Sequence, residues 1–268
     1  MVELFTVADV AAASGDDCMV VWAAQGLRGG VRAWALDGAV AVASPRLNRR
    51  DRLTVCGPAA QAAELVRRVL PGLGPSYRLL GERSLVAELV GRLPGARPPT
   101  GFEWMETGEA VAAGGVRGDG AVAAGAGPAG EVRPGGGGAV WLPPEADGQV
   151  AALLAVASPS AWAVPGVAGI RRWAGIRGVG GELVAVAADA WSAPQVGFVA
   201  GVGTAPPWRG RGLGEAVCRF VVGELAAEHG RVALMVDTGN RGAIRVYARL
   251  GLRIRPVAAA ELSAVGAR

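Results

Sequence analysis

The stretch Val202-Gly-Thr-Ala-Pro-Pro-Trp-Arg-Gly-Arg-Gly-Leu-Gly214 decides how the rest of the chain is organised. It begins inside an apolar run rich in β-forming residues, 196–204, and turns at Pro206-Pro207. A helical pattern over residues 215–228 follows its last glycine. The stretch is therefore predicted to join a strand to a helix through a glycine-rich loop.

This loop has the chemistry of a phosphate-binding site. The first N–H groups of a helix lack partners within the helix, and the helix dipole places partial positive charge there. Arg209 and Arg211 add permanent positive charge and forked donors for phosphate oxygens. Glycine lets the backbone approach an anion closely, and the loop contains Gly210, Gly212 and Gly214. We therefore expect an anionic ligand here.

Residues 139–268 form the unit around this loop, and strand and helix patterns alternate along them. The expected strands cover residues 139–142, 170–176, 182–188, 196–204 and 231–236, and a last strand starts at residue 252. The expected helices cover residues 145–156, 215–228 and 241–250. The pattern is typical of a mixed α/β unit.

Residues 1–107 are expected to form a second mixed α/β unit. β-forming runs cover residues 19–23, 31–35, 39–43, 52–56, 77–80 and 102–107. Helical spacing covers residues 58–70 and 82–93. Asp37-Gly38 is a tight-turn signal between two of the runs. Residues 108–138 are low in complexity and rich in glycine, and we interpret them as a Gly/Ala-rich linker.

The composition excludes several classes of protein. All 27 basic residues are arginines, the net charge is only +4, and the arginines are scattered, so the chain lacks a nucleic-acid footprint. Three cysteines far apart and one histidine argue against a disulfide framework and a Cys/His zinc site. The acidic N-terminus is unlike a signal peptide, and no apolar run has the length of a membrane span. A cytoplasmic protein without a metal is expected.

Three features of the second unit resemble the GNAT superfamily of N-acetyltransferases. Arg209-Gly-Arg-Gly-Leu-Gly214 fits the family's Arg/Gln-x-x-Gly-x-Gly/Ala pyrophosphate loop, and Gly201 to Trp208 fits the preceding strand and turn. Asn240-Arg-Gly-Ala-Ile-Arg-Val-Tyr-Ala-Arg-Leu-Gly-Leu252 fits the family's Asn-x-x-Ala-x-x-x-Tyr-x-x-x-Gly-Phe, with leucine in place of the usual phenylalanine. The resemblance covers roughly residues 139–256.

The resemblance implies an α/β (α+β) fold. Its sheet would be GNAT-like, mixed and largely antiparallel, with flanking helices, in two tandem GNAT-like units. Residues 139–268 would be the acetyl-CoA-binding catalytic domain. Residues 1–107 have the family's order of elements but no phosphate loop, so they resemble the degenerate N-terminal half of two-part GNAT proteins.

The resemblance also assigns ligand-binding roles. Acetyl-CoA, as cosubstrate, would place its pyrophosphate on the loop and its pantetheine arm along the strand edge before it. Tyr247 would act as general acid on the departing thiolate, which a phenol with a pKa of about 10 can do at neutral pH. The implied cofactor-binding residues are Val202, Gly203, Thr204, Arg209, Gly210, Arg211, Gly212, Leu213, Gly214 and Asn240.

The general base stays open. Many relatives place a glutamate on the strand before the loop, but residues 196–204 contain no acid, and Gln195 lies just before them. Three other carboxylates are candidates, and each also fits a solvated or capping role: Glu182, Asp189 and Asp237. Water is a further alternative. His229 is interpreted as a cation favourable to a helix C-terminus, and Cys218 as a core residue.

The leading hypothesis is an acetyl-CoA-dependent N-acetyltransferase, with a small-molecule primary amine as acceptor. One alternative is a GNAT-like amide-forming enzyme that uses aminoacyl-tRNA, and another is a non-catalytic acyl-CoA-binding module. No membrane partner is expected, and a homodimer stays open. Three tryptophans are candidates for an acceptor pocket, although each taken singly is expected in the core: Trp162, Trp173 and Trp191.

Overall fold

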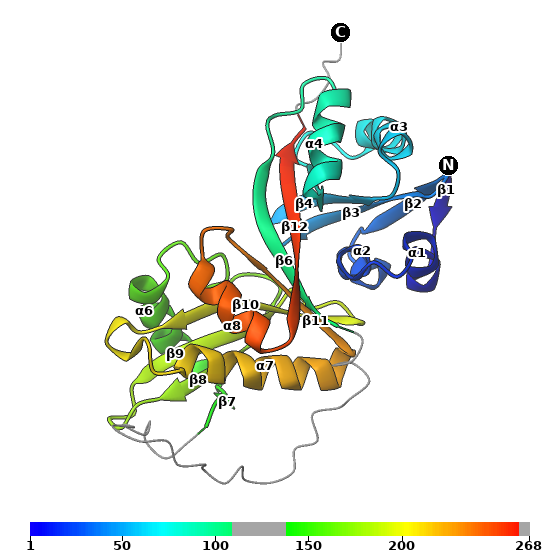
Figure 1. Ribbon diagram of the computed structural model, residues 1–268. Helices are drawn as coiled ribbons and strands as arrows, with labels where there is room; N and C mark the ends of the chain where they lie inside the picture. The colour runs from blue at the N-terminus through cyan, green and yellow to red at the C-terminus, as the bar shows by residue number, and fades with distance from the viewer. Residues whose placement is uncertain (109–137, 263–268) are drawn as a thin grey trace.

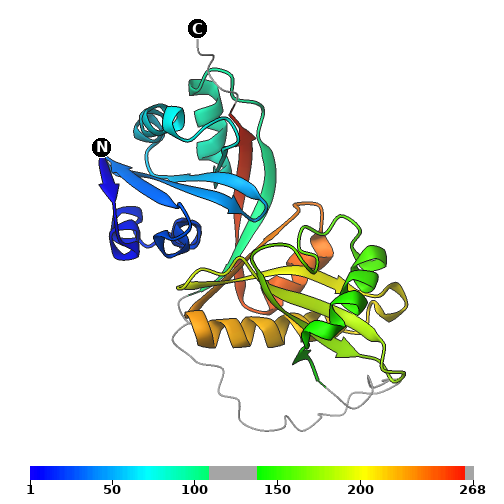
Figure 2. The same ribbon diagram turned by 180° about the vertical axis from the view of Figure 1, so that it is seen from behind.

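The computed structural model describes residues 1–108 and 138–262. It shows two α/β units joined by long strands (Figures 1 and 2). The described strands form one 12-stranded sheet in the order β1-β2-β3-β4-β5-β12-β6-β11-β10-β9-β8-β7. The strand order shows that strands of the two units are hydrogen-bonded to each other within one sheet.

The N-terminal unit surrounds the first half of the sheet. Its strands are β1 (Val2–Leu4), β2 (Arg32–Leu36), β3 (Ala39–Leu47), β4 (Arg50–Cys56), β5 (Arg78–Glu82) and β6 (Thr100–Thr107). Its helices are α1 (Val7–Ser14), α2 (Cys18–Ala24), α3 (Ala59–Val69) and α4 (Arg83–Arg92). Asp37 and Gly38 join β2 to β3 with φ of 45° and 83°, which confirms the predicted tight turn.

The C-terminal unit follows the predicted order of elements closely. Its strands are β7 (Val140–Trp141), β8 (Ile170–Arg177), β9 (Leu183–Ala190), β10 (Val196–Thr204), β11 (Arg231–Val236) and β12 (Leu252–Glu261). Its α-helices are α6 (Asp147–Ala157), α7 (Leu213–His229) and α8 (Arg241–Arg249), and 3-10 turns lie at Pro144–Ala146 and Pro206–Trp208. The bounds of β10 and β11 are those predicted from the sequence.

Each unit gives its last strand to the other. β6 comes from the N-terminal unit but lies between β11 and β12, with Leu234 opposite Met105 and Ile254 also opposite Met105. β12 comes from the C-terminal unit and pairs along its second half with β5. The domain boundaries predicted at residues 107 and 139 stay predictions. The strand exchange adds that the part of the sheet in each unit includes a strand from the other unit.

Two strand pairs in the described sheet are parallel, β4 with β5 and β10 with β11, and the other pairs are antiparallel. Helices pack on both faces of this sheet. The predicted fold class, a mixed and largely antiparallel sheet flanked by helices, is therefore confirmed. In both parallel pairs the two strands separate toward their carboxyl ends, which is where ligands bind in open α/β sheets.

The apolar core has one cluster in each unit and one between them. The cluster between the units centres on Trp22 of α2, Trp104 of β6 and Phe198 of β10, and the Trp22 and Phe198 rings stack with centroids 4.6 Å apart. The Nε1 of Trp22 donates to the carbonyl of Trp191 at 2.8 Å. Because all three aromatic rings are buried, we expect the units to unfold together.

The strand predicted at residues 19–23 is wrong. These residues lie in α2, which the Asp17 carboxylate caps by accepting from the N–H groups of Met19 and Val20. Every residue of α2 is buried. A helix buried on all sides has no polar face, so its sequence resembles that of a buried strand.

Most of the predicted linker lies outside the described residues, which stop at residue 108 and resume at residue 138. Among the described helices, none has both the length and the apolar character needed to cross a membrane.

Candidate functional site

The glycine-rich loop lies between β10 and α7, as the sequence predicts. Gly210 and Gly212 both have φ of 76°, a left-handed conformation that disfavours other residues. Gly212 is the N-cap of α7, and no side chain caps the helix. The N–H groups of Leu213, Gly214 and Glu215 are therefore left for solvent or a ligand.

The loop is open on its outer side. A Cβ built on Gly210 or Gly212 would meet no atom within 4 Å. Gly214 is closer to the strand, because a Cβ there would lie 3.0 Å from the Thr204 hydroxyl. The glycines thus provide both the left-handed turns and the space in which an anion can reach the helix N-terminus.

The two loop arginines are anchored differently. The Arg209 guanidinium donates to the carbonyls of Thr204 at 3.2 Å and Ala157 at 2.9 Å, so it ties α6 to the end of β10. The Arg211 guanidinium lies 5.0 Å from the ring centroid of Trp208. Neither forms an ion pair within the described residues. The loop therefore keeps its positive charge.

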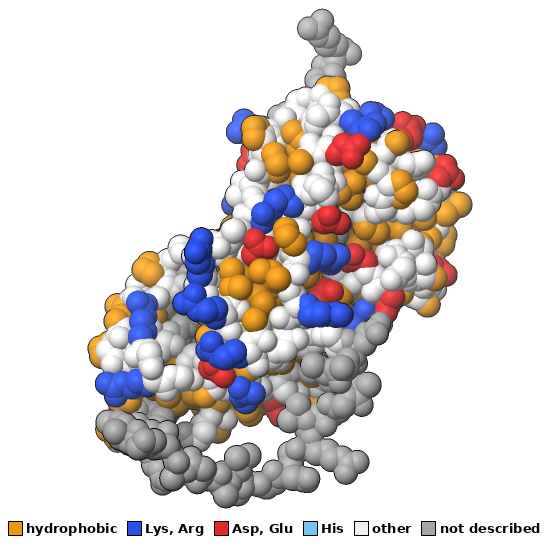
Figure 3. Space-filling model, viewed as in Figure 1, with side chains coloured by type: hydrophobic (Ala, Val, Ile, Leu, Met, Phe, Trp, Pro, Cys, Tyr) orange, Lys and Arg blue, Asp and Glu red, His pale blue; other side chains and the backbone are white. Residues whose placement is uncertain are grey.

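More arginines lie beside the loop on α8. Arg241, Arg245 and Arg249 are exposed and spaced four residues apart, and basic side chains form a row over this helix (Figure 3). Arg249 pairs with Glu215 at 2.6 Å. Arg241 and Arg245 have no carboxylate partner in the described part of the chain. The surface around the helix N-terminus of α7 is therefore suited to a polyanion.

β10 separates from β11 next to this loop. Their pairing runs from Val196 with Arg231 to Val199 with Leu234 and then stops. A bulge follows in β10 between Ala200 and Gly203, where Gly201 has a φ of 61°. Beyond Val199, no described strand pairs with the backbone of β10 on the side of β11. A strand edge of this kind can hydrogen-bond an extended ligand.

The bulge was missed by the sequence analysis, although Gly201 and Gly203 were a signal for it. A Cβ on Gly201 would lie 2.5 Å from the Trp173 ring. A Cβ on Gly203 would lie 3.1 Å from Leu154 of α6. Glycine is therefore required at Gly201, where the φ is positive and the ring is within 2.5 Å, whereas at Gly203 a side chain would only crowd Leu154.

Asn240 and Tyr247 occupy the two ends of α8. The Asn240 side chain caps the helix by accepting from the Ala243 N–H at 3.1 Å. Tyr247 is 6% exposed and packs in the cluster that contains Cys218 of α7. Burial, and then the neighbouring Cys218 thiol, raises the pKa of Tyr247 well above its usual range. The phenol is therefore protonated at neutral pH.

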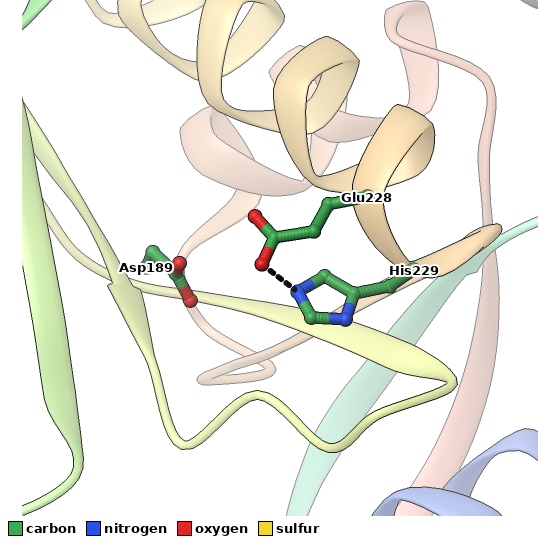
Figure 4. A group of neighbouring side chains, drawn as sticks. All are labelled: Asp189, Glu228 and His229. Atoms are coloured by element: carbon green, nitrogen blue, oxygen red, sulfur yellow. Dashed lines mark ion pairs between the residues drawn. The ribbon is translucent and has the colours of Figure 1, made fainter.

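Asp189 does not lie near the loop. It is fully buried on β9, where it accepts from the Ser192 hydroxyl at 2.6 Å and from Arg172 at 3.2 Å. It belongs with Glu228 and His229 at the C-terminal end of α7 (Figure 4). The loop is at the other end of this 17-residue helix, about 25 Å away.

The group of Asp189, Glu228 and His229 has the ligand types of a metal site, but arginines already supply its positive charge. Arg172 contacts Asp189 at 3.2 Å and Glu228 at 2.6 Å, and Arg171 contacts the same two carboxylates at 3.4 and 2.9 Å. These pairs leave little unbalanced negative charge, so we interpret the group as an ion-pair network.

The other base candidates are exposed. Asp237 follows the carboxyl end of β11, where its carbonyl accepts from the Asn240 N–H at 2.9 Å. Glu182 lies in the turn between β8 and β9, and Gln195 precedes the opposite end of β10. Asp237 lies at the end where β10 and β11 are apart, and Glu182 lies near the same end, because β9 begins beside it and pairs with the end of β10.

The remaining candidates divide between core and surface. Trp173, Trp191 and Cys218 are buried, as expected of core residues, and burial raises the pKa of the Cys218 thiol to about 12. Trp162 is 44% exposed, on the segment between α6 and β8. His229 ends α7, where its Nδ1 lies 3.3 Å from the Pro194 carbonyl.

The N-terminal unit has a counterpart of this site with the opposite charge. β4 and β5 pair only from Arg52 to Thr54, and a pocket of about 250 Å³ lies beyond them. The pocket is lined by residues that include Asp17, Glu82 and Glu88. Its one arginine, Arg255, is bound to Asp17 at 2.5 and 3.2 Å. These carboxylates disfavour a phosphate group.

Comparisons with known proteins agree with the C-terminal site. Residues 165–252 match the sequence model of the acetyltransferase (GNAT) family. A GCN5-related N-acetyltransferase from Kribbella flavida is 21% identical, and the match covers 91% of this chain and 95% of that one with a TM-score of 0.52. One from Sphaerobacter thermophilus is 19% identical, over 94% and 88% of the two chains, with a TM-score of 0.50. No curated protein matches the chain.

At these identities the solved structures support the fold, and the family match supports the chemistry. The family match over residues 165–252 indicates the class of transferases that move acyl groups. Within that class, residues 165–252 match the GNAT family, and the chain has a fold similar to that of the two solved GCN5-related N-acetyltransferases.

Proposed function

We propose that the protein is an N-acetyltransferase that moves an acetyl group from acetyl-CoA to the primary amine of a small molecule. One observation carries the proposal. The unpartnered edge of β10 leads directly into an open, positively charged loop at the N-terminus of α7. An extended arm that ends in a pyrophosphate fits an edge followed by an anion site.

The residues of the C-terminal unit fit the two parts of acetyl-CoA. The amides from Gly210 to Gly214, with Arg209 and Arg211, would hold the pyrophosphate. The backbone N–H of Leu213 is the first of the free helical N–H groups. The backbone of Val202, Gly203 and Thr204 would pair with the pantetheine arm. Asn240 fixes the start of α8 and keeps an Nδ2 group that has no hydrogen-bond partner in the described chain.

The thioester, when bound, supplies an activated acyl carbon. The neutral amine attacks this carbon, a C–N bond forms, the C–S bond breaks, and the amine gives its extra proton to water. N–H groups at the β10 edge would stabilise the negative oxygen. Tyr247 is the proposed general acid: its hydroxyl donates a hydrogen bond to the departing sulfur. A thiol has a pKa of about 8.5, which is lower than the pKa of the buried phenol. The phenol therefore stabilises the thiolate by a hydrogen bond before any proton is transferred.

Calorimetry with acetyl-CoA tests the binding step. Gly212→Asp places a negative charge at the helix N-terminus, and we expect it to weaken binding at least about tenfold. Gly212→Asn is the matched control, because asparagine tolerates the same left-handed backbone without the charge. Arg209→Glu should also weaken binding. Wild-type protein that binds no acyl-CoA at millimolar concentration would refute the proposal.

A free-thiol assay over a panel of amines tests the chemical step. We expect Tyr247→Phe to lower kcat by about 10²-fold or more while acetyl-CoA binding stays within about twofold. Acetyl-CoA binding without turnover of any amine would instead indicate a non-catalytic acyl-CoA-binding module.

A further inference from the structure

The turn between β3 and β4, in the N-terminal unit, reaches the C-terminal unit. Asn48 donates from its Nδ2 to the Met235 sulfur at 3.8 Å. Arg49 donates to the carbonyl of Trp162 at 3.1 Å. The Arg50 guanidinium lies 5.2 Å from the centroid of the Trp162 ring. Three successive residues of one turn thus contact two separate segments of the other unit.

Both of these segments border the separation of β10 from β11. Met235 directly follows Leu234, the last residue of β11 that pairs with β10. Trp162 precedes Ala163, whose Cβ would be 3.1 Å from a Cβ built on Gly201 at the β10 bulge. The turn therefore reaches from the free end of β11 to the segment that packs on the bulge.

The turn lies on the face of the sheet opposite the proposed acid. Met235 packs against the cluster shared by α2 and α6, whereas Tyr247 belongs to the cluster under α7. An acyl group held at the β10 edge would be approached from the α2 and α6 face by an acceptor. Together with α2, the turn is a part of the N-terminal unit that borders this approach.

Asn48 has an unused hydrogen-bond acceptor at this place. Its side chain is buried, with the residue only 7% exposed, and its Oδ1 has no hydrogen-bond partner among the residues that the structure describes. A buried acceptor left unpaired costs about 1–3 kcal/mol. Asn48 and Arg49 also have φ of 48° and 60°, and an arginine is unusual at the second position of such a turn. The oxygen is enclosed in this structure, so a ligand N–H would satisfy it after a local movement of the exposed turn.

The charge around the turn favours an anionic ligand group. Arg49 and Arg50 are exposed and form no ion pair in the described part of the chain. The acid of the same hairpin, Asp51, accepts instead from the backbone N–H of Arg46 at 2.8 Å. A guanidinium resting on an aromatic ring keeps its edge donors free for a carboxylate or phosphate.

We propose that Asn48 accepts a hydrogen bond from the acceptor amine through its Oδ1, and that Arg50, resting on Trp162, binds an anionic group of the same acceptor. The acceptor is then an amine that also carries a carboxylate or a phosphate, and the N-terminal unit selects it. The inference rests on the proposed function, because the turn borders an acceptor path only if acyl transfer occurs at the β10 edge.

Calorimetry on the full chain saturated with CoA tests this inference with paired probes. One pair is an α-amino acid and its carboxamide, and the other is aminoethyl phosphate and ethanolamine. We expect the anionic member of at least one pair to bind at least about tenfold more tightly. The pair that shows the difference identifies the anionic group.

Three variants separate the contributions. Asn48→Gly keeps the left-handed turn and should weaken both members of the pair by about tenfold. Arg50→Met keeps an apolar stem on Trp162 and should remove the preference for the anionic member. Arg46→Gly is the matched control: it has a φ of 55° in the same hairpin, and its side chain has no hydrogen bond or ion pair in the described chain. It should leave both affinities within about twofold.

Equal affinity for charged and uncharged amines, no binding of any probe, or an unchanged Asn48→Gly would overturn the inference. Acetyl-CoA binding, measured first on the same samples, tests the proposed function separately and should be the same in all three variants. If acetyl-CoA does not bind, the proposed function fails, and the amine series measured without CoA still decides the role of Asn48.

Discussion

The β10 bulge can be tested with a single methyl group. Gly201→Ala adds a Cβ where the φ is 61°, a conformation that costs alanine about 1–2 kcal/mol. The same Cβ would lie 2.5 and 2.7 Å from two carbons of the Trp173 ring, closer than any contact allows. Trp173 is buried on β8, so it has little room to move.

The expected loss combines strain with overpacking. Overpacking a dense core typically costs about 1–3 kcal/mol, so Gly201→Ala should lower the free energy of unfolding by about 2–5 kcal/mol in all. Gly210→Ala is the matched control, because its φ is 76° but its Cβ would meet nothing within 4 Å. It should show the strain alone, about 1–2 kcal/mol.

Urea unfolding of four proteins separates the two terms: wild type, Gly201→Ala, Trp173→Leu and the double variant. Trp173→Leu is destabilising itself, but it removes the ring that the new methyl meets. In that background Gly201→Ala should cost only about 1–2 kcal/mol. The same loss in both backgrounds, or a loss below that of Gly210→Ala, would refute the close packing of the bulge against Trp173.

Two further predictions concern the whole fold. Burial raises the pKa of the Cys218 thiol to about 12 and of the Cys56 thiol to about 11, so the folded state holds these protons above pH 8.5 while the unfolded state loses them. The free energy of unfolding should therefore be highest below about pH 8.5 and fall above it. In urea unfolding, the free energy of unfolding of Cys218→Ala should fall by about 1 kcal/mol less than that of wild type between pH 9 and 10. The same pH dependence in both proteins would contradict this. A fragment of residues 138–268 lacks β6, which pairs with β11 and β12. It should therefore show no cooperative unfolding by circular dichroism unless a peptide of residues 98–108 is added. Cooperative unfolding of the fragment alone at the wild-type midpoint would contradict the strand exchange.

Local patterns sufficed to predict the strand and the helix at the centre of the candidate site. β10 is an unbroken apolar run that ends at Pro206, and α7 begins at a glycine and follows helical spacing. Each signal comes from a few adjacent residues, so no tertiary information is needed. Asn240 at the start of α8 and Tyr247 on its buried face follow from the same kind of signal.

Features that depend on distant contacts were not predictable. α2 was mistaken for a strand because it is buried by both units, which removes the polar face that identifies a helix. The exchange of β6 and β12 leaves no local trace, because any apolar strand can pair with either neighbour. The contacts of Asn48 with Met235 join residues 187 positions apart, beyond the reach of any sequence window.

The strand exchange gives the N-terminal unit a structural role that needs no phosphate loop. β6 supplies the C-terminal unit with the strand beside β11, so the half that carries the proposed acyl-CoA site depends on the other for its sheet. The β4–β5 pocket is lined by acids and lacks the positive charge of the C-terminal loop. The same shared sheet holds the β3–β4 turn against β11. The proposed acceptor contacts and the proposed acyl-donor loop therefore lie in different units, so substitutions in the turn leave the residues of the loop unchanged.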